Sequence, residues 1–133
     1  MNTIRNSVKA IIIKNGCLLT VKNIDSEGDW YLLPGGGQNL GETFEEALRR
    51  ECIEEIGIEI SVGRLRYIRE YIGKNHEFSA HDGDAHQVEF MFECEFDDAQ
   101  PPELGTNPDA YQVDIAWVPI SNIHEYRLSE IVR

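Results

Sequence analysis

The segment GGGQNLGETFEEALRRECIEEIG, residues 35–57, joins a glycine triplet to a stretch with six glutamates, and it decides how the rest of the chain is interpreted. Thr43 and Glu46 have the spacing of a capping box, in which both side chains accept hydrogen bonds from the backbone of the first helical turn. Gly57 suits the position after a helix, where a left-handed backbone is common. The segment therefore predicts a helix of about four turns between Thr43 and Gly57.

The apolar arc of this helix, drawn at about 100° per residue, also contains two glutamates. Its hydrophobic members are Phe44, Ala47, Leu48 and Cys52. Glu51 and Glu55 fall in the same arc, and Glu54 lies at its margin. Like charges four residues apart repel each other, and desolvation makes the repulsion stronger. A divalent cation would offset it, and oxygen ligands favour Mg²⁺ or Mn²⁺ over zinc.

Two simpler interpretations stand beside this one. A solvated helix face explains the first-turn glutamates, Glu45 and Glu46, but it does not explain Glu51 and Glu55. The glycine triplet is either a flexible turn or a segment whose backbone approaches a ligand closely.

Composition limits the class of protein and its partners. The 133 residues suit one domain, 1–133, with 41% hydrophobic residues. The net charge of −12 argues against a basic patch for nucleic acid, whereas bound metal would let an acidic protein accept an anionic substrate. The three cysteines lack the CxxC spacing of a zinc site and suit free thiols in a reducing cytosol. The apolar run Val8–Ile13 is too short for a signal peptide or a membrane span, so a cytoplasmic protein is expected.

Strands are predicted on both sides of the helix. Val8–Ile13 and Cys17–Val21 flank an Asn-Gly turn, and His86–Phe96 alternates strictly between phenylalanine-rich and glutamate-rich faces. Shorter strands are expected at 30–33, 58–60, 65–72 and 113–118, loops at 23–29, 73–85 and 97–109, and a last helix at 121–132 capped by Ser121 or Asn122. This order predicts a mixed α/β (or α+β) fold.

The fixed positions of the opening segment resemble the Nudix box of the MutT-like hydrolases, Gx5Ex7REUxEExGU, where U is a bulky aliphatic residue. The matching residues are Gly36, Glu42, Arg50, Glu51, Glu54, Glu55, Gly57 and Ile58. Cys52, at the first U, is a mild departure that should still pack. The flanking strands, Trp117-Val118-Pro119 and the last helix extend the similarity over the chain. The resemblance implies the Nudix fold, a mixed β-sheet between α-helices.

The implied activity is Mg²⁺- or Mn²⁺-dependent hydrolysis of a nucleoside diphosphate linked to another moiety, X, by a pyrophosphohydrolase. In the family pattern Glu51, Glu54 and Glu55 hold the metal, with the Gly35 carbonyl as a backbone ligand. Arg50 orients these glutamates, and one carboxylate accepts the proton of the attacking water. The glutamate that acts as base differs within the family.

Further candidates lie outside the helix. Many family members add an acid, and Glu89 is preferred over Glu93, Glu95, Asp82 and Asp84, although a solvent-facing strand also explains such residues. Candidate substrate contacts are Gly36, Gly37, Glu42, His86 and Trp30, with the loop histidines His76 and His81 and the aromatics Tyr31 and Phe78 as weaker ones. Glu42 would support the loop before the helix or reach metal through water.

The substrate is left open among nucleoside triphosphates, nucleotide sugars, dinucleotides and capped RNA ends, and a small nucleotide is expected. A catalytically silent nucleotide-binding or sensor domain on the same fold is the alternative function. A structural Ca²⁺ site is disfavoured because the chain has no Asp/Asn-rich loop of the required length. Similar proteins are often dimers, so a homodimer is left open, and no membrane association is expected.

Overall fold

The computed structural model describes residues 3–26, 28–73, 86–97, 99, 101–103, 105 and 112–126. The elements in chain order are β1 (Arg5–Ile11), β2 (Ile13–Lys14), β3 (Cys17–Asp25), β4 (Gly28–Leu32), β5 (Gly35–Gly37), α1 (Phe44–Ile56), β6 (Ile60–Ile72), β7 (His86–Phe96), β8 (Gln112–Pro119) and the 3₁₀ helix η2 (Ile120–Glu125).

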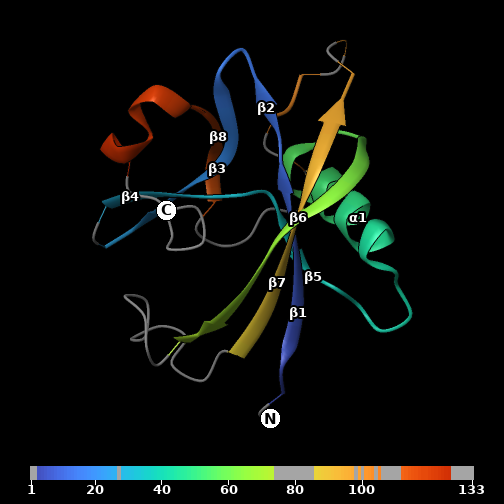
Figure 1. Ribbon diagram of the computed structural model, residues 1–133. Coiled ribbons are helices and arrows are strands. Elements are labelled where there is room, and N and C mark those ends of the chain that lie inside the picture. Colours follow the sequence, from blue (N-terminus) through green and yellow to red (C-terminus); the bar gives the residue numbers. More distant parts are fainter. Residues whose placement is uncertain are drawn as a thin grey trace.

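The strands form two sheets in the described part of the chain. The first has the order β5-β1-β7-β6, in which β1 and β7 run parallel and the other neighbours run antiparallel. The second joins β2, β3 and β4, and β8 pairs with β3 on its other side. Figure 1 shows α1 on one side of the strands and η2 on the other. The predicted mixed α/β class is confirmed, with two sheets where one mixed sheet was expected.

The first hairpin follows the prediction, but the next one extends further than expected. Asn15 and Gly16 have φ values of 51° and 76°, as a two-residue turn of the I′ type requires. The expected loop at 23–29 is wrong, because β3 continues to Asp25 and β4 already begins at Gly28. Cross-strand pairing continues through the polar end of the hairpin, where Asn23, Ile24 and Asp25 lie opposite residues 30, 29 and 28.

The predicted helix and both of its ends are confirmed. The Glu46 amide donates to the Thr43 hydroxyl at 3.1 Å, and the Thr43 amide donates to the Glu46 carboxylate at 2.8 Å. Gly57 ends the helix with φ 68°, and its amide donates to the Ile53 carbonyl. The buried face consists of Ala47, Leu48, Cys52, Glu55 and Ile56. Of the two glutamates that the wheel placed in the apolar arc, Glu55 is buried, whereas Glu51 is half-buried at its edge.

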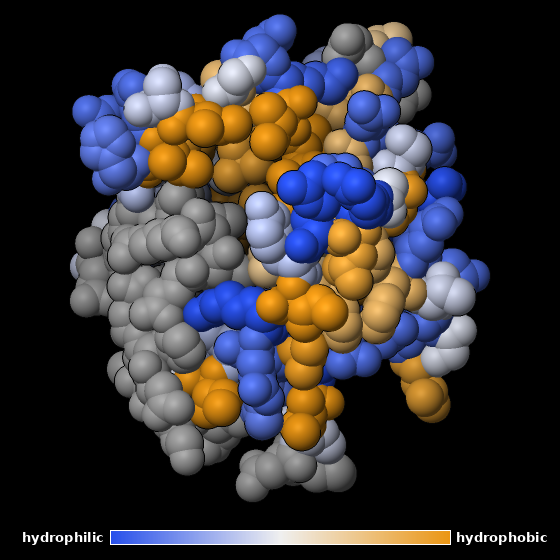
Figure 2. Space-filling model, in the orientation of Figure 1, coloured by the Kyte–Doolittle hydropathy of each residue, from blue (hydrophilic) through white to orange (hydrophobic). Residues whose placement is uncertain are grey.

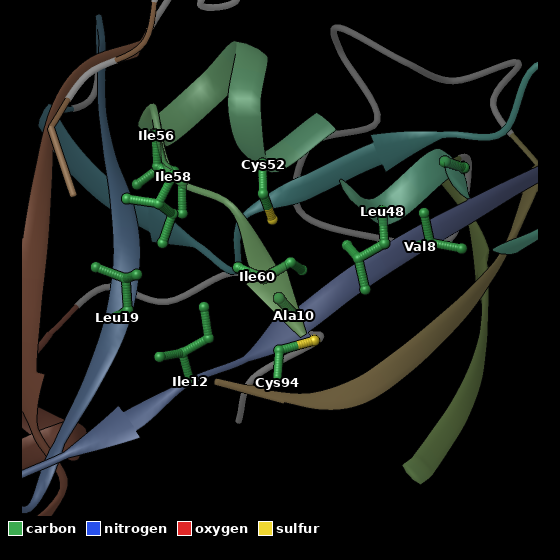
Figure 3. Packing of buried hydrophobic residues seen from close by; sticks show 12 residues of the cluster. Val8, Ala10, Ile12, Leu19, Leu48, Cys52, Ile56, Ile58, Ile60 and Cys94 are labelled. Carbon is green, nitrogen blue, oxygen red and sulfur yellow. The ribbon is translucent and has the colours of Figure 1, made fainter. Parts of the chain in front are cut away.

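The core fixes α1 against the first sheet. Figure 3 shows Leu48, Cys52 and Ile56 of the helix turned toward β1 and its neighbours. The labelled partners are Val8, Ala10, Ile12, Leu19, Ile58, Ile60 and Cys94. At the start of the helix Phe44 stacks on Phe90, with 4.4 Å between ring centroids. Dense packing of this kind leaves α1 little freedom to move relative to the sheet.

Strand β7 has the limits and the alternation that the sequence predicts. Phe90, Phe92 and Cys94 belong to the core between the sheet and α1. The opposite face of β7 therefore carries Glu89, Met91 and Glu93. Strand β6 is continuous where two shorter strands were expected, with register shifts between Val62 and Tyr67 that absorb the irregularity. Several β6 side chains are exposed, namely Leu65, Tyr67 and Ile68. Figure 2 shows hydrophobic side chains among hydrophilic ones on the face in view.

The C-terminal helix begins differently from the prediction. A 3₁₀ helix starts at Ile120, directly after Pro119, and it has no side-chain cap, so capping by Ser121 or Asn122 is wrong. Pro119 is the last residue of β8, still opposite Cys17, and the chain turns into the 3₁₀ segment directly after it. The expected helix beyond residue 126 lies outside the described residues. Among the helices that the structure describes, none combines the length and the apolar character needed to cross a membrane.

Candidate functional site

The glycine triplet is a strand, β5, paired with β1, rather than a turn. A side chain on Gly36 would overlap the carboxylate of Glu51. Gly35 has φ 141°, and a side chain there would overlap the carbonyl oxygen of Val8. The absence of side chains therefore lets the strand lie against both β1 and the acidic side of α1. Of the two interpretations of the triplet, close approach of the backbone agrees with this geometry.

Arg50 ties the carboxylates of the loop and the helix together. Its Nε and Nη2 donate to the two oxygens of Glu42 at 2.6 and 3.0 Å. Its Nη1 donates to Glu51 at 3.3 Å and to Glu54 at 3.1 Å. A last bond, at 3.0 Å, runs from Nη2 to the Gly37 carbonyl. One guanidinium thus orients three acids against the glycine strand, and Glu42 holds the loop before the helix.

The pKa values of this group follow from the same bonds. The hydrogen bond from Arg50 lowers the pKa of the Glu42 carboxyl, and the backbone amide of Asn39 lowers it further. The bond to Glu42 raises the pKa of the Arg50 guanidinium above its ordinary value, and the nearby Glu51 and Glu54 act in the same direction. The two pKa shifts are in opposite directions, and both favour the charged forms of the Arg50–Glu42 pair.

Glu55 occupies the most enclosed position of the three box acids. Its residue is only 6% exposed. The Gly35 amide donates to Glu55 Oε1 at 3.0 Å, and the Gln112 side-chain amide donates to Oε2 at 2.5 Å. Two N–H donors thus stabilise a carboxylate that burial alone would disfavour. Two adjacent residues of the glycine strand thus contact two acids: Gly35 contacts Glu55, and Gly36 contacts Glu51.

Gln112 is the residue of this site that sequence reasoning missed. It lies at the start of β8, opposite Asn23 on β3, and it is 57 positions from Glu55. The strand predicted from the sequence began at residue 113 and so did not include Gln112. A polar residue at the edge of an apolar strand is too common a feature to indicate such a contact.

Glu89 is buried, as an acid with a special role would be, but it lies on the sheet face turned away from α1. It forms a row across the sheet with Ser7, Gly37 and Arg69. Arg69 Nη1 lies 3.8 Å from Glu89 Oε1. The structure does not bring Glu89 into the network of Arg50, so its role as a ligand stays a prediction. Glu93, by contrast, pairs with Arg64 and Arg66 near the surface.

The candidate substrate contacts fall into three groups. Trp30, on β4, pairs in register with Asn23, which in turn pairs with Gln112, so the three residues form one row across the second sheet. His86 Nε2 lies 2.7 Å from Glu70 Oε2 at the start of β7, away from the Arg50 network. The substrate candidates His76, Phe78 and His81 lie outside the described residues, as do Asp82 and Asp84, two alternatives for the additional acid. Tyr31 contacts Tyr126 edge to face.

The acidic side chains of the site are already held by hydrogen-bond donors. In the described ranges, no three acidic, histidine or cysteine side chains are already arranged as a metal cage. Amide and guanidinium donors hold the carboxylates instead. The chemistry of the donors still fits a hard cation, because Glu51, Glu54, Glu55 and the Gly35 backbone offer only oxygen ligands. A bound cation would have to compete with Arg50 and Gln112 for these oxygens.

The two cysteines near the site are structural. Burial raises the pKa of the Cys52 thiol well above its ordinary value, and the nearby Cys94 and Glu55 raise it further. Burial also raises the pKa of Cys94 to about 12. Both thiols therefore stay protonated and pack as small apolar groups. The departure from the box at Cys52 is accommodated as expected.

Comparison with known families and sequences agrees with this geometry. The model of the NUDIX domain matches residues 3–132. The nucleoside triphosphatase NudI of Enterobacter sp. (strain 638) is 34% identical over 97% of this chain and 92% of its own length. The NudI of Salmonella heidelberg (strain SL476) is 29% identical over the same shares.

Solved structures show the same fold. A MutT NUDIX hydrolase from Burkholderia pseudomallei has a TM-score of 0.67 and 26% identity, over 90% of this chain and 85% of that one. The ORF135 protein of E. coli has a TM-score of 0.73 at 19% identity, over 96% and 82% of the two chains.

Proposed function

The chain belongs to the NUDIX family, and on that premise we propose that it hydrolyses the diphosphate linkage of a nucleoside triphosphate with the help of Mg²⁺ or Mn²⁺. The family and the NudI relatives make the chain a nucleotide pyrophosphohydrolase. The relatives, which are named nucleoside triphosphatases, favour a triphosphate over nucleotide sugars or dinucleotides. The net charge of −12 favours a small nucleotide over nucleic acid.

One observation carries the proposed roles: two acids of α1 lie against neighbouring residues of one glycine strand. Glu51 lies against Gly36, and Glu55 accepts from the Gly35 amide. Carboxylates so close to each other repel unless a positive charge lies between them. We assign metal binding to Glu51, Glu54 and Glu55 with the Gly35 carbonyl, and a supporting role to Arg50 and Glu42.

The chemistry needs little beyond positioning and charge neutralisation. Divalent metal at this site would neutralise the diphosphate and lower the pKa of the attacking water. Arg50 holds Glu51 and Glu54 in one orientation through its bonds at 3.3 and 3.1 Å. A carboxylate of α1 accepts the proton of the attacking water. Gly36 and Gly37 carry no side chain, so the Glu51 carboxylate and the Arg5 guanidinium can lie directly against the strand where the phosphates would bind.

Three assignments outside the box complete the proposal. Glu89 is the additional acid, since it is the buried one among the glutamates of β7. Trp30 contacts the base, since its row across the second sheet leads to Gln112 and Glu55. The chain works as one domain in the cytoplasm, consistent with its three free cysteines.

A nucleotide panel tests this function. The protein is incubated with nucleoside triphosphates, nucleoside diphosphate sugars and dinucleotides, with Mg²⁺ or Mn²⁺, and released phosphate and pyrophosphate are measured. We expect turnover of a triphosphate that a chelator abolishes and added metal restores. Glu54→Gln and Glu55→Gln should each lower kcat about a hundredfold, because each removes charge aimed at the transition state.

Glu45→Gln is the matched control, since Glu45 lies on the exposed first turn and pairs only with Arg49 among the ion pairs described. Its kcat should equal that of the wild type. Absence of turnover on every substrate, or Gln variants at positions 54 and 55 as active as the wild type, would contradict the proposal and favour a silent nucleotide-binding domain.

A further inference from the structure

Strand β1 presents two basic residues beside the glycine strand. Val8 and Ala10 of β1 are fully buried in the core under α1. Successive side chains of a strand point to opposite faces, so Arg5, Ser7 and Lys9 share the other face. In the register of the two strands, Ser7 lies opposite Gly37 and Lys9 lies opposite Gly35. The two cations therefore flank the strand on the face that Glu51 does not occupy.

Arg5 reaches over the glycine strand itself. A side chain on Gly37 would overlap the guanidinium of Arg5, so this group lies directly against the Gly37 backbone. The carbonyl of the same residue accepts from Arg50 at 3.0 Å. Two guanidinium groups thus meet at Gly37, although only Arg50 is tied to the acids of α1. Arg5 adds positive charge where a phosphate would approach.

Arg5 and Lys9 differ from the other cations of the sheet in their ion pairing among the described residues. Within the residues that the structure describes, no carboxylate lies within ion-pair distance of either one. The neighbouring cation on this face, Arg69, does have Glu89 at 3.8 Å. Acids outnumber bases by 24 to 12, so pairing would be easy to achieve. Two cations that no described carboxylate pairs with, on one face of the strand, favour an anionic ligand.

We propose that Arg5 and Lys9 bind the terminal phosphates of the substrate and select a triphosphate over a nucleoside diphosphate linked to an uncharged sugar. The inference rests on the proposed function, because it identifies the group linked to the nucleoside diphosphate, X, as a further phosphate. The diphosphate lies along the edge strand β5, with the acids of α1 on one face and the cations of β1 on the other. Charge-assisted bonds to phosphate oxygens then add affinity that a neutral X group does not receive.

Substitution of the two cations tests the proposal. Arg5→Gln, Lys9→Gln and the double variant are titrated with inorganic tripolyphosphate in the presence of Mg²⁺, and KM and kcat are measured for a nucleoside triphosphate and a nucleoside diphosphate sugar. Each single variant should weaken tripolyphosphate binding and raise the triphosphate KM by about tenfold or more, with kcat changed by less than about threefold. The KM for the sugar derivative should change by less than about threefold.

Controls separate charge from folding. Arg49→Gln removes a cation on the exposed side of α1, where Arg49 pairs with Glu45 at 3.2 Å, and should leave binding unchanged. Arg5→Lys should retain most of the affinity for tripolyphosphate, because it keeps the positive charge. Thermal unfolding shows whether each variant is folded. If Arg5→Gln does not fold, Lys9→Gln and Arg5→Lys still carry the test.

The outcomes are distinct from those of the proposed function. Tripolyphosphate binding and KM values that stay unchanged in the double variant would overturn the assignment of Arg5 and Lys9. An equal rise of KM for the sugar derivative would overturn the selection of triphosphates. If the wild type hydrolyses no nucleotide, the proposed function fails, whereas the tripolyphosphate titration still decides whether the two cations bind phosphate.

Discussion

Each of the three adjacent glycines, Gly35, Gly36 and Gly37, is required for a different structural reason. Gly35 needs a backbone conformation, because its φ of 141° is one that residues with a side chain rarely adopt. Gly36 needs space, because the Glu51 carboxylate fills the place of its side chain. Gly37 leaves the same space to Arg5. At this scale the glycines are part of the site and not a flexible link.

Alanine substitutions should therefore separate stability from activity. Gly35→Ala introduces strain and an overlap with the Val8 backbone, so it should lower the free energy of unfolding by about 2 kcal/mol or more. Gly36→Ala meets only the movable end of Glu51, so its stability should stay within about 1 kcal/mol of the wild type. It should still lower kcat about a hundredfold by displacing that carboxylate. Urea unfolding and the nucleotide assay check both; equal effects of the two variants on stability would contradict this account.

At the scale of the element, α1 is specified by its own ends. The capping box satisfies two backbone amides, and Gly57 satisfies the last turn. Phe44 and Leu48 then anchor the first half of the helix in the core. These core contacts lie between the cap and Glu51. Loss of the cap hydrogen bonds should therefore lower the stability of the helix more than it moves the Glu51 carboxylate. Cap energy and site geometry are separable contributions.

Thr43→Ala should lower the free energy of unfolding by about 1 kcal/mol, because the hydroxyl that accepts from the Glu46 amide is lost. Thr43→Ser should retain most of the stability. In a Glu46→Ala background, where the reciprocal bond is already missing, the cost of Thr43→Ala should be smaller. Denaturant unfolding of the wild type, the two alanine variants and their double variant provides this comparison. If the losses of the single variants add up to that of the double variant, the two hydrogen bonds of the box are not cooperative.

At the scale of the whole molecule, the site depends on contact between the two sheets. Glu55 belongs to α1, Gly35 to the first sheet and Gln112 to the second. The Gln112 amide therefore fastens the second sheet to the acidic helix. It also places the row of Asn23 and Trp30 next to the site. The docking of the sheets therefore fixes where the row of Trp30 lies relative to Glu55.

Removal of this contact should affect both folding and metal binding. Gln112→Ala takes one donor from a buried carboxylate, which should lower the free energy of unfolding by about 1–3 kcal/mol. Saturating Mn²⁺ should stabilise the variant more than the wild type, because the freed Glu55 oxygen becomes available to metal. Val113→Thr, at an exposed neighbouring position, is the control. Thermal unfolding with and without Mn²⁺ measures both effects; an equal metal shift in all three proteins would contradict the role of Gln112.

The sequence alone determined the helix, its two caps, the alternation of β7, the Asn-Gly hairpin and the spacing of the box. Each of these depends on hydrogen bonds or periodicities within a few residues, which local sequence specifies. The wheel placed Glu51 and Glu55 in the apolar arc; Glu55 is buried there, and Glu51 is half-buried. The 3₁₀ start of the last helix and the length of β3 were missed, because strand pairing and Pro119 outweighed local polarity there.

Only the tertiary structure decided what surrounds these acids. The glycine triplet became a strand because β1 supplied its partner, and Arg50 connected Glu42 with Glu51 and Glu54 because the loop folded back on the helix. Arg5 over Gly37 and Gln112 on Glu55 join residues 32 and 57 positions apart. No periodicity encodes such distances, since they follow from the packing of sheets against a helix. The sequence supplied the candidate groups, and packing decided which of them meet.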